Sequence, residues 1–384
     1  MKRFLIYVFL AFMFFMVACT TAPKKEETVE KREKKVEVKK EPKEPEDWAK
    51  NHTKKAMDAL EMKEGKVDFD TALKHFKKAV EAYPKSPTVH YNLGVVYQRM
   101  GEDIKAVQSY NKALDIKQDY SLPVVNKASI YANKLEYNRA VEVCNDFLED
   151  NEKNKIVLSA LSGFYMLMGN HIEAVQAVRR ILVQDPSDID ALKNLGMIYL
   201  RKGDDGLARM VTEGAIKIDN EDSGLINNRG VIYSKQGDDS KAMLFYGKAL
   251  QLDENNESAN FNVGSVAMDY GDAERAFYNF ANVLAKNPDN VNARIGFAIA
   301  LRGLGKFKEA EKQYKQVLEE EPNNALASFN LGVLYYDHMD QRVKAKEFFR
   351  KYKSLAESIG EDHIVDKYLE DKVFIYPGEA KKEE

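Results

Sequence analysis

The 384-residue sequence contains few of the residues that cross-linked or irregular folds require. Its only two cysteines are Cys19 and Cys144, which excludes a disulfide scaffold and a zinc site built from several cysteines. It has 10 prolines and one tryptophan, whereas charged residues make up 31% of the chain. A chain rich in Ala, Glu, Lys, Leu, Asn and Tyr but poor in Pro is typical of a helical protein. The formal net charge of −3 offers no strongly basic surface for nucleic acid.

A long apolar run stands at the N-terminus. Lys2 and Arg3 precede 15 apolar residues, from Phe4 to Ala18, and Cys19 follows at once. Fifteen residues are short for a bilayer span, which needs about 20. A basic start, a short apolar core and a small residue before the cysteine therefore indicate an export signal.

The sequence Met16-Val17-Ala18-Cys19 resembles the lipobox of bacterial lipoproteins, with Met16 where leucine is usual. The resemblance implies a signal peptide at 1–18, acyl chains such as palmitate on Cys19, and a lipid-anchored location in the bacterial cell envelope. Thr20, rather than aspartate, after the cysteine implies the periplasmic face of the outer membrane. Plain cleavage after a small residue and an uncleaved anchor are the alternatives.

Charged residues of both signs dominate the segment after the signal. Residues 19–47 contain almost no large apolar side chains, so they cannot bury enough surface to offset the entropy of ordering. We expect a lipidated N-terminus followed by a disordered tether that gives the folded part reach. A charged helix is the alternative. The end of the chain, 378–384, is also expected to be a disordered tail.

A period of 34 residues runs through most of the remaining chain. Alanine marks the first eight repeats, small residues lie 12 positions before it in most of them, and glycines and aromatic residues recur at their own fixed offsets. The series are Ala72, Ala106, Ala140, Ala174, Ala208, Ala242, Ala276 and Ala310; Gly101, Gly169, Gly203, Gly237, Gly271 and Gly305; and Phe76, Tyr110, Tyr246, Phe280, Tyr314 and Phe348. The pattern predicts two helices in each repeat. The small and aromatic residues pack between these two helices, and the glycine ends the first helix with a positive φ.

This spacing resembles the tetratricopeptide repeat, which residues 87–120 carry nearly whole. The resemblance implies an all-α fold, a right-handed α-solenoid of about nine 34-residue helix-turn-helix repeats. We place the solenoid at 48–358, in frame from residue 53, and a C-terminal capping helix at 359–377. The last repeat is irregular, because its alanine, Ala345, comes one residue late.

No catalytic motif is evident in the sequence. Its six histidines have no metal-ligand spacing, and the chain contains neither a nucleophile elbow nor a phosphate-binding loop. Cys144 occupies an aromatic position of the repeat and is predicted to be a small buried residue rather than a nucleophile. We therefore expect no enzyme activity, no cofactor and no metal.

Asparagine recurs at the sixth position of six repeats, on the helix that would line the concave face. In the tetratricopeptide superhelix of O-GlcNAc transferases such a ladder holds an extended peptide, and the resemblance implies the same use here. The alternative is that these amides bond a neighbouring repeat and only shape the solenoid. The predicted peptide-binding residues are Asn92, Asn126, Asn194, Asn228, Asn262 and Asn330 from this series, with Tyr91, Arg99, Lys193, Arg201, Phe261, Arg302 and Phe329 at other concave positions.

The expected function is that of a scaffold for proteins or extended peptide segments, anchored to the membrane by acyl chains. Repeat lipoproteins of this kind serve gliding motility, type IV pili or secretion complexes, so the resemblance implies such an envelope machine. An adaptor for peptidoglycan hydrolases or synthases, and an outer-membrane assembly factor, are the alternatives. Nucleic acid is not expected as a partner.

Overall fold

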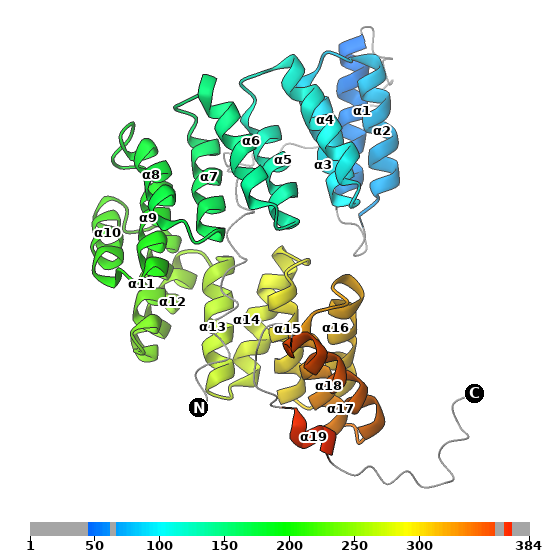
Figure 1. The fold of residues 1–384 in the computed structure, drawn as a ribbon, viewed down its shortest axis with the longest axis vertical. Helices are drawn as coiled ribbons and strands as arrows, with labels where there is room; N and C mark the ends of the chain where they lie inside the picture. Colours follow the sequence, from blue (N-terminus) through cyan, green and yellow to red (C-terminus); the bar gives the residue numbers. More distant parts are fainter. Residues whose placement is uncertain (1–44, 62–66, 358–364, 371–384) are drawn as a thin grey trace, which may run out of the picture. The chain divides into compact units, whose positions relative to one another are not determined.

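The computed structural model describes residues 45–61, 67–357 and 365–370. The predicted signal peptide, Cys19, the predicted tether up to residue 44 and the predicted tail at 378–384 lie outside these residues. Within the described residues all regular secondary structure is helical, which confirms the predicted all-α fold of helix pairs (Figure 1).

The helices occur two to a repeat. They are α1 (Pro45–Leu60), α2 (Phe69–Ala82), α3 (Pro87–Arg99), α4 (Asp103–Ile116), α5 (Ser121–Asn133), α6 (Tyr137–Asp150), α7 (Lys155–Leu167), α8 (His171–Leu182), α9 (Ile189–Lys202), α10 (Asp205–Ile218), α11 (Ser223–Lys235), α12 (Asp239–Leu252), α13 (Glu257–Asp269), α14 (Ala273–Lys286), α15 (Val291–Gly303), α16 (Phe307–Glu320), α17 (Ala325–Asp337), α18 (Arg342–Glu357) and α19 (Asp366–Glu370). The described part of α1 begins at Pro45, so the last three residues of the segment predicted as tether are helical. Of the predicted capping helix, α19 is described, and it packs on α18.

The chain divides into two compact units. Helices α1 to α9 belong to the first unit, which ends at Asp204, and α10 to α19 belong to the second, which begins at Asp205. The boundary falls inside the fifth predicted repeat, between its two helices. Each unit therefore has a core of its own, and each is described separately below.

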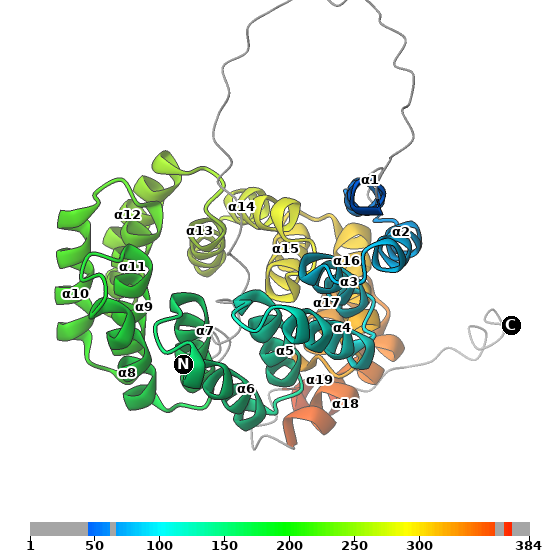
Figure 2. The same cartoon turned by 90° about the horizontal axis from the view of Figure 1, so that it is seen from above.

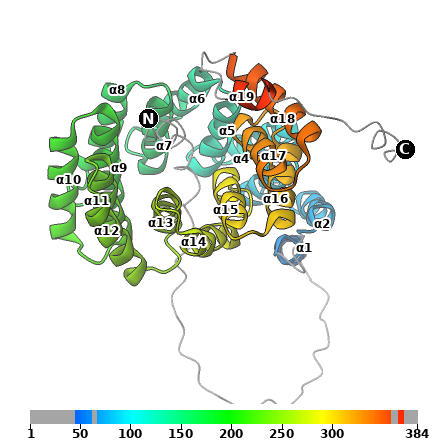
Figure 3. The ribbon, with the colours of Figure 1, turned by 90° about the horizontal axis from the view of Figure 1, so that it is seen from below.

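Within each unit the odd-numbered helices form one surface. Successive odd-numbered helices contact one another, from α3 through α5 and α7 to α9 in the first unit and from α11 through α13 and α15 to α17 in the second (Figure 2, Figure 3). The even-numbered helices of successive repeats lie further apart. The odd-numbered helices therefore line the inner side of each unit's curvature, as the repeat pattern predicts. We call this surface the odd-helix face of each unit.

Small residues and aromatic rings meet in the seams between paired helices, as predicted. A Cβ atom added at Gly94 would lie 2.5 Å from the ring of Tyr110, and one added at Gly230 would lie 2.6 Å from the ring of Tyr246. Both rings are almost completely buried. Glycine is therefore required at these positions because the ring occupies the space of a side chain.

The last repeat corrects one predicted aromatic position. Phe349, and not Phe348, packs against Gly332, where an added Cβ would lie 2.7 Å from the Phe349 ring. The repeat contains one extra residue in the turn between α17 and α18, where Asp340 has φ 51°. The extra residue shifts every later core position by one, so Ala345 and Phe349 are fully buried.

The six glycines predicted to end the first helix of a repeat all have positive φ, between 74° and 91°. The third repeat has Leu135 at this place with φ 62°, and it keeps the same turn, because the amide of Glu136 donates to the carbonyl of Tyr131 at 2.9 Å. A leucine with positive φ is strained because its Cβ crowds the backbone.

Replacing Leu135 by glycine is expected to raise the free energy of unfolding of the first unit by about 1 kcal/mol, because it removes this strain. The leucine side chain is 66% exposed, so little packing is lost. Urea unfolding followed by circular dichroism measures the change. Leu135→Ala keeps a Cβ and is the control, expected to stay within about 0.5 kcal/mol of the wild type; an equal gain in both variants would contradict the strain argument.

Candidate functional site

All predicted peptide-binding residues lie on odd-numbered helices, divided between the two units. The first unit holds Tyr91, Asn92 and Arg99 on α3, Asn126 on α5, and Lys193, Asn194 and Arg201 on α9. The second unit holds Asn228 on α11, Phe261 and Asn262 on α13, Arg302 on α15, and Phe329 and Asn330 on α17. The sequence pattern thus selects one surface in each unit.

Three asparagines of the series bond the preceding repeat in the same way. The Nδ2 of Asn194 donates to Oγ of Ser159 at 3.1 Å, and the Nδ2 of Asn262 donates to Oδ1 of Asn227 at 2.9 Å. In the third case Nδ2 of Asn126 lies 3.4 Å from the hydroxyl of Tyr91. Each bond joins residues 35 apart, so these amides tie neighbouring odd-numbered helices together.

This bond gives the asparagines a structural role, and it leaves part of each amide for a ligand. An amide side chain has two N–H donors and an acceptor oxygen, and the bond to the preceding repeat uses one N–H. Asn194 and Asn262 are only half-buried. Peptide binding by the series therefore remains a prediction, and the amides on the odd-helix faces have the chemistry for it.

The predicted aromatic residues contribute both to the core and to the surface. Tyr91 packs on Tyr110 with ring centroids 5.9 Å apart, and Phe261 packs on Phe280 at 5.5 Å. Phe329 lies 5.2 Å from the ring of Tyr352. All three predicted side chains are half-buried, so part of each ring is exposed on the odd-helix face.

The predicted cations differ in their surroundings. Arg99 and Arg201 are exposed. Lys193 forms an ion pair with Asp190 at 2.9 Å, so its charge is partly compensated. Arg302 is half-buried, and its Nη1 donates to Oδ1 of Asn330 at 3.3 Å. Arg302 therefore differs from the other predicted cations because it combines partial burial with a hydrogen bond to a neutral amide.

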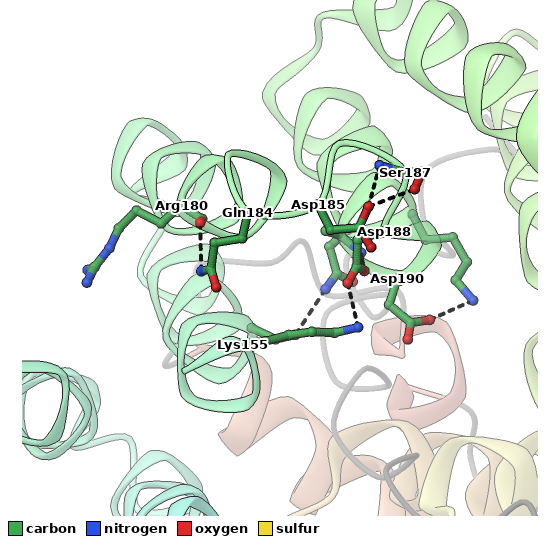
Figure 4. A network of polar contacts seen from close by, with 11 residues as sticks. Lys155, Arg180, Gln184, Asp185, Ser187, Asp188 and Asp190 are labelled. Atoms are coloured by element: carbon green, nitrogen blue, oxygen red, sulfur yellow. Dashed lines mark hydrogen bonds and ion pairs between the residues drawn. The ribbon is translucent and has the colours of Figure 1, made fainter. Parts of the chain in front are cut away.

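The sequence analysis missed the acceptors Ser159 and Asn227. Both stand at the fifth position of their repeats, directly before the asparagine position, and their polarity is the signal that could have identified them. It also missed a polar network at the junction of α7, α8 and α9 (Figure 4). There Asp188, with a side chain only 5% exposed, forms an ion pair with Nζ of Lys155 at 2.5 Å and accepts from the amide of Ala191 at 2.9 Å. This network stabilises the N-terminus of α9 and, with it, the position of Lys193 and Asn194.

A histidine pair joins the two helices of the first repeat. Nδ1 of His52 on α1 lies 2.7 Å from Nδ1 of His75 on α2, and the ring of Trp48 lies 3.9 Å from that of His52. One Nδ1 must donate and the other must accept, so at least one ring is neutral. Burial lowers the pKa of both histidines, and the nearby cations Lys55 and Lys78 lower it further.

Acidification is expected to destabilise the α1–α2 pair. Because the pKa values are lowered in the folded chain, the unfolded chain binds more protons as the pH falls below about 6.5, and stability present above that pH is lost. The urea midpoint should therefore drop between about pH 7.5 and about pH 5.5. The His52→Gln/His75→Gln variant should lose most of this drop. His90→Gln, on α3, is the control and should keep it; an unchanged drop in the double variant would refute the assignment.

The single cysteine of the described residues lies in the core. Cys144 is completely buried, as predicted, and burial raises the pKa of its thiol to about 12. In the described ranges no three His, Cys, Asp or Glu residues are grouped as metal ligands. The helices of the same ranges are all too short or too polar to cross a membrane.

Comparison with known families finds repeats in both units. Family models described as tetratricopeptide repeat or TPR repeat match residues 68–101, 87–120, 224–256 and 267–328. Among curated proteins, the chain is 23% identical over 137 residues to the BBSome complex member BBS4 of Bos taurus. The match covers 36% of this chain and 26% of that protein, so the chain spans about a quarter of that relative's length.

Solved structures show the same fold. The chain is similar to a tetratricopeptide repeat protein from Parabacteroides merdae, with a TM-score of 0.52 and 20% identity over 66% of this chain and 98% of that one. It is also similar to the APC/C hetero-tetramer Cut9–Hcn1, with a TM-score of 0.53 and 15% identity over 84% of this chain and 67% of that one. At these identities the likeness is one of fold.

Proposed function

The chain is a tetratricopeptide repeat protein, and on that premise we propose that it is a scaffold that binds extended segments of other proteins on its odd-helix faces. Tetratricopeptide repeat proteins bind proteins or peptides and are generally not enzymes. We propose the same for this chain, with no catalytic role of its own.

The observation that carries the proposal is the arrangement of the amide side chains. Asn194 and Asn262 each use one N–H to bond the preceding repeat, at 3.1 Å and 2.9 Å. That bond holds the amide in one orientation, so a ligand need not pay the entropy of ordering it. An extended peptide offers a regular series of N–H and C=O groups, and amides on successive helices match both kinds of group.

The membrane anchor belongs to the proposal as well. It is supported by the lipobox-like residues Met16 to Cys19, which lie outside the described residues. We propose a bacterial lipoprotein on the periplasmic face of the outer membrane that serves a motility, type IV pilus or secretion machine. Cys19→Ser should release the full chain from membranes, as measured by fractionation. Continued membrane association of that variant would refute acylation as the anchor.

Peptide binding is tested by pairing ladder variants with variants of their acceptors. The full chain is purified from crosslinked cell envelopes, and its partners are quantified by mass spectrometry. Asn194→Ala with Asn262→Ala should reduce partner recovery about tenfold, because the odd-helix face of each unit loses a ligand hydrogen bond. Ser159→Ala with Asn227→Ala breaks the same two bonds between repeats but keeps the ladder amides, so it should lower recovery less than the ladder variant does, by no more than the entropy of ordering two freed amides. If both double variants lose stability and partners equally, the ladder is structural.

A further inference from the structure

In the second and third repeats, Gln98, Tyr110 and Asn126 form a cluster in which the buried tyrosine hydroxyl has all of its hydrogen-bond partners. The hydroxyl of Tyr110 donates to Oε1 of Gln98 at 2.6 Å and accepts from Nδ2 of Asn126 at 3.3 Å. Gln98 is the twelfth residue and Tyr110 the twenty-fourth residue of one repeat, and Asn126 is the sixth residue of the next. The buried hydroxyl thus has both an acceptor and a donor.

In the last two repeats the same three positions hold Arg302, Tyr314 and Asn330. The hydrogen bonding of this second cluster is incomplete. Tyr314 is completely buried, and its hydroxyl has no hydrogen-bond partner. Arginine in place of glutamine explains this, because a guanidinium has donors and no acceptor oxygen. Asn330 offers no help, since its Nδ2 donates to the carbonyl of Leu326 at 2.9 Å and its Oδ1 accepts from Arg302.

The cluster therefore has an excess of donors and of positive charge. The guanidinium of Arg302 forms no ion pair with a carboxylate of the described residues, and its bond to the amide oxygen of Asn330 is long, at 3.3 Å. Burial raises the pKa of Tyr314, so its hydroxyl keeps its proton and remains a donor. This cluster lacks the acceptor oxygen that Gln98 gives the cluster at Tyr110, and it lacks a negative charge to balance Arg302.

A carboxylate supplies both. Its two oxygens lie in one plane and match the fork of a guanidinium, and one of them can also accept from a phenolic hydroxyl. Arg302 is half-buried on the odd-helix face, so its charge is less screened there than on an open surface. Phe329, which precedes Asn330 on α17, packs against the core that contains Tyr314 and is half-buried, so part of its ring is exposed to the carbon atoms of a ligand.

We propose that Arg302 and Tyr314 form a subsite for a carboxylate of a protein segment bound on the odd-helix face of the second unit. The inference rests on the proposed peptide-binding function and specifies its ligand as an acidic one. Arg302 makes the first contact, because the Tyr314 hydroxyl lies below the surface. The hydroxyl completes the site once the guanidinium turns from Asn330 toward the ligand.

Peptide selection tests the subsite. The full chain in detergent is used to select from random peptide libraries, one with free and one with amidated C-termini. We expect enrichment of Asp or Glu at one fixed position, or of free C-termini, which separates side-chain from terminal carboxylates. Arg302→Gln should abolish this preference and weaken the selected peptides about tenfold or more. Arg209→Gln, an exposed arginine on the even-numbered helix α10 of the same unit, is the control and should change neither.

A second pair of variants separates binding from stability. Tyr314→Phe removes an unpartnered hydroxyl, so it should raise the urea midpoint and yet weaken acidic peptides severalfold. Tyr110→Phe removes a bonded hydroxyl, so it should lower the midpoint and leave the acidic preference unchanged. Selection of peptides without any acidic preference would overturn the subsite alone. Failure to select any peptide would overturn the proposed function with it.

Discussion

Replacing Gly94 by valine is expected to lower the free energy of unfolding of the first unit by about 3 kcal/mol. A Cβ at this position would lie 2.5 Å from Cε1 of Tyr110. The ring cannot move aside easily, because it is completely buried and its hydroxyl is bonded to both Gln98 and Asn126. The added side chain must therefore push α3 and α4 apart. Urea unfolding followed by circular dichroism measures the loss.

Gly214 provides the matched control. It also lies inside a helix, α10, but no heavy atom lies within 4 Å of the position of its Cβ. Gly214→Val should therefore change stability by less than about 0.5 kcal/mol, since helix propensity slightly favours valine over glycine. Similar losses in the two variants would show that valine in the helix, and not the contact with Tyr110, is responsible.

Replacing Asp188 by alanine is expected to cost about 2 kcal/mol. The side chain caps α9 through the amide of Ala191 at 2.9 Å and forms an ion pair with Lys155 at 2.5 Å. The carboxylate is 5% exposed, whereas Lys155 is 52% exposed. Because the lysine can turn to solvent after the change, most of the loss comes from the uncapped helix.

Two further variants divide this effect. Asp188→Asn keeps the cap and removes the charge, so it should cost less than half as much as Asp188→Ala. Asp190→Ala removes an exposed carboxylate two residues further along, which pairs with Lys193, and should stay within about 0.5 kcal/mol of the wild type. Hydrogen exchange of the α9 amides locates the change. A global loss of protection in Asp190→Ala would contradict the assignment.

The fold was predictable because the same residue spacing, and with it the same helix-pair geometry, recurs in successive repeats. Each glycine with positive φ, from Gly101 to Gly305, depends on one local requirement, that of a left-handed residue after a helix. The pairing of Gly94 with Tyr110 follows in the same way from the constant spacing between the two helices of a repeat. At Leu135 the same turn forms although leucine does not suit a positive φ, because the neighbouring repeats impose the conformation.

The structure was needed to explain why the asparagine series is interrupted at Gly296. At Gly296 the series is broken because a Cβ there would lie 2.5 Å from the ring of Phe280, which belongs to the preceding repeat. At Asn126 the corresponding ring is that of Tyr110, whose hydroxyl accepts a hydrogen bond instead. The identity of one residue thus depends on another 16 positions earlier, in a different helix. A pattern based on the 34-residue period treats the two positions as independent.

The candidate site was predicted at the level of a surface and not of contacts. Periodicity placed Asn262 and Arg302 on the odd-helix face, but it did not reveal that the first bonds Asn227 or that the second bonds Asn330. Those partners depend on side-chain rotamers across a helix–helix contact. The division of the chain between Asp204 and Asp205 was likewise invisible, because the repeat spacing continues through it.

The position of Trp48 gives the chain a built-in optical reporter. It is the only tryptophan of the sequence, and its ring lies 3.9 Å from that of His52, at the contact between α1 and α2. Indole emission therefore reports on the first repeat, whereas ellipticity at 222 nm averages over every helix. If the terminal repeat frays before the rest melts, the emission transition will precede the ellipticity transition. The interval between the two curves then measures how strongly the end of the array is coupled to its interior.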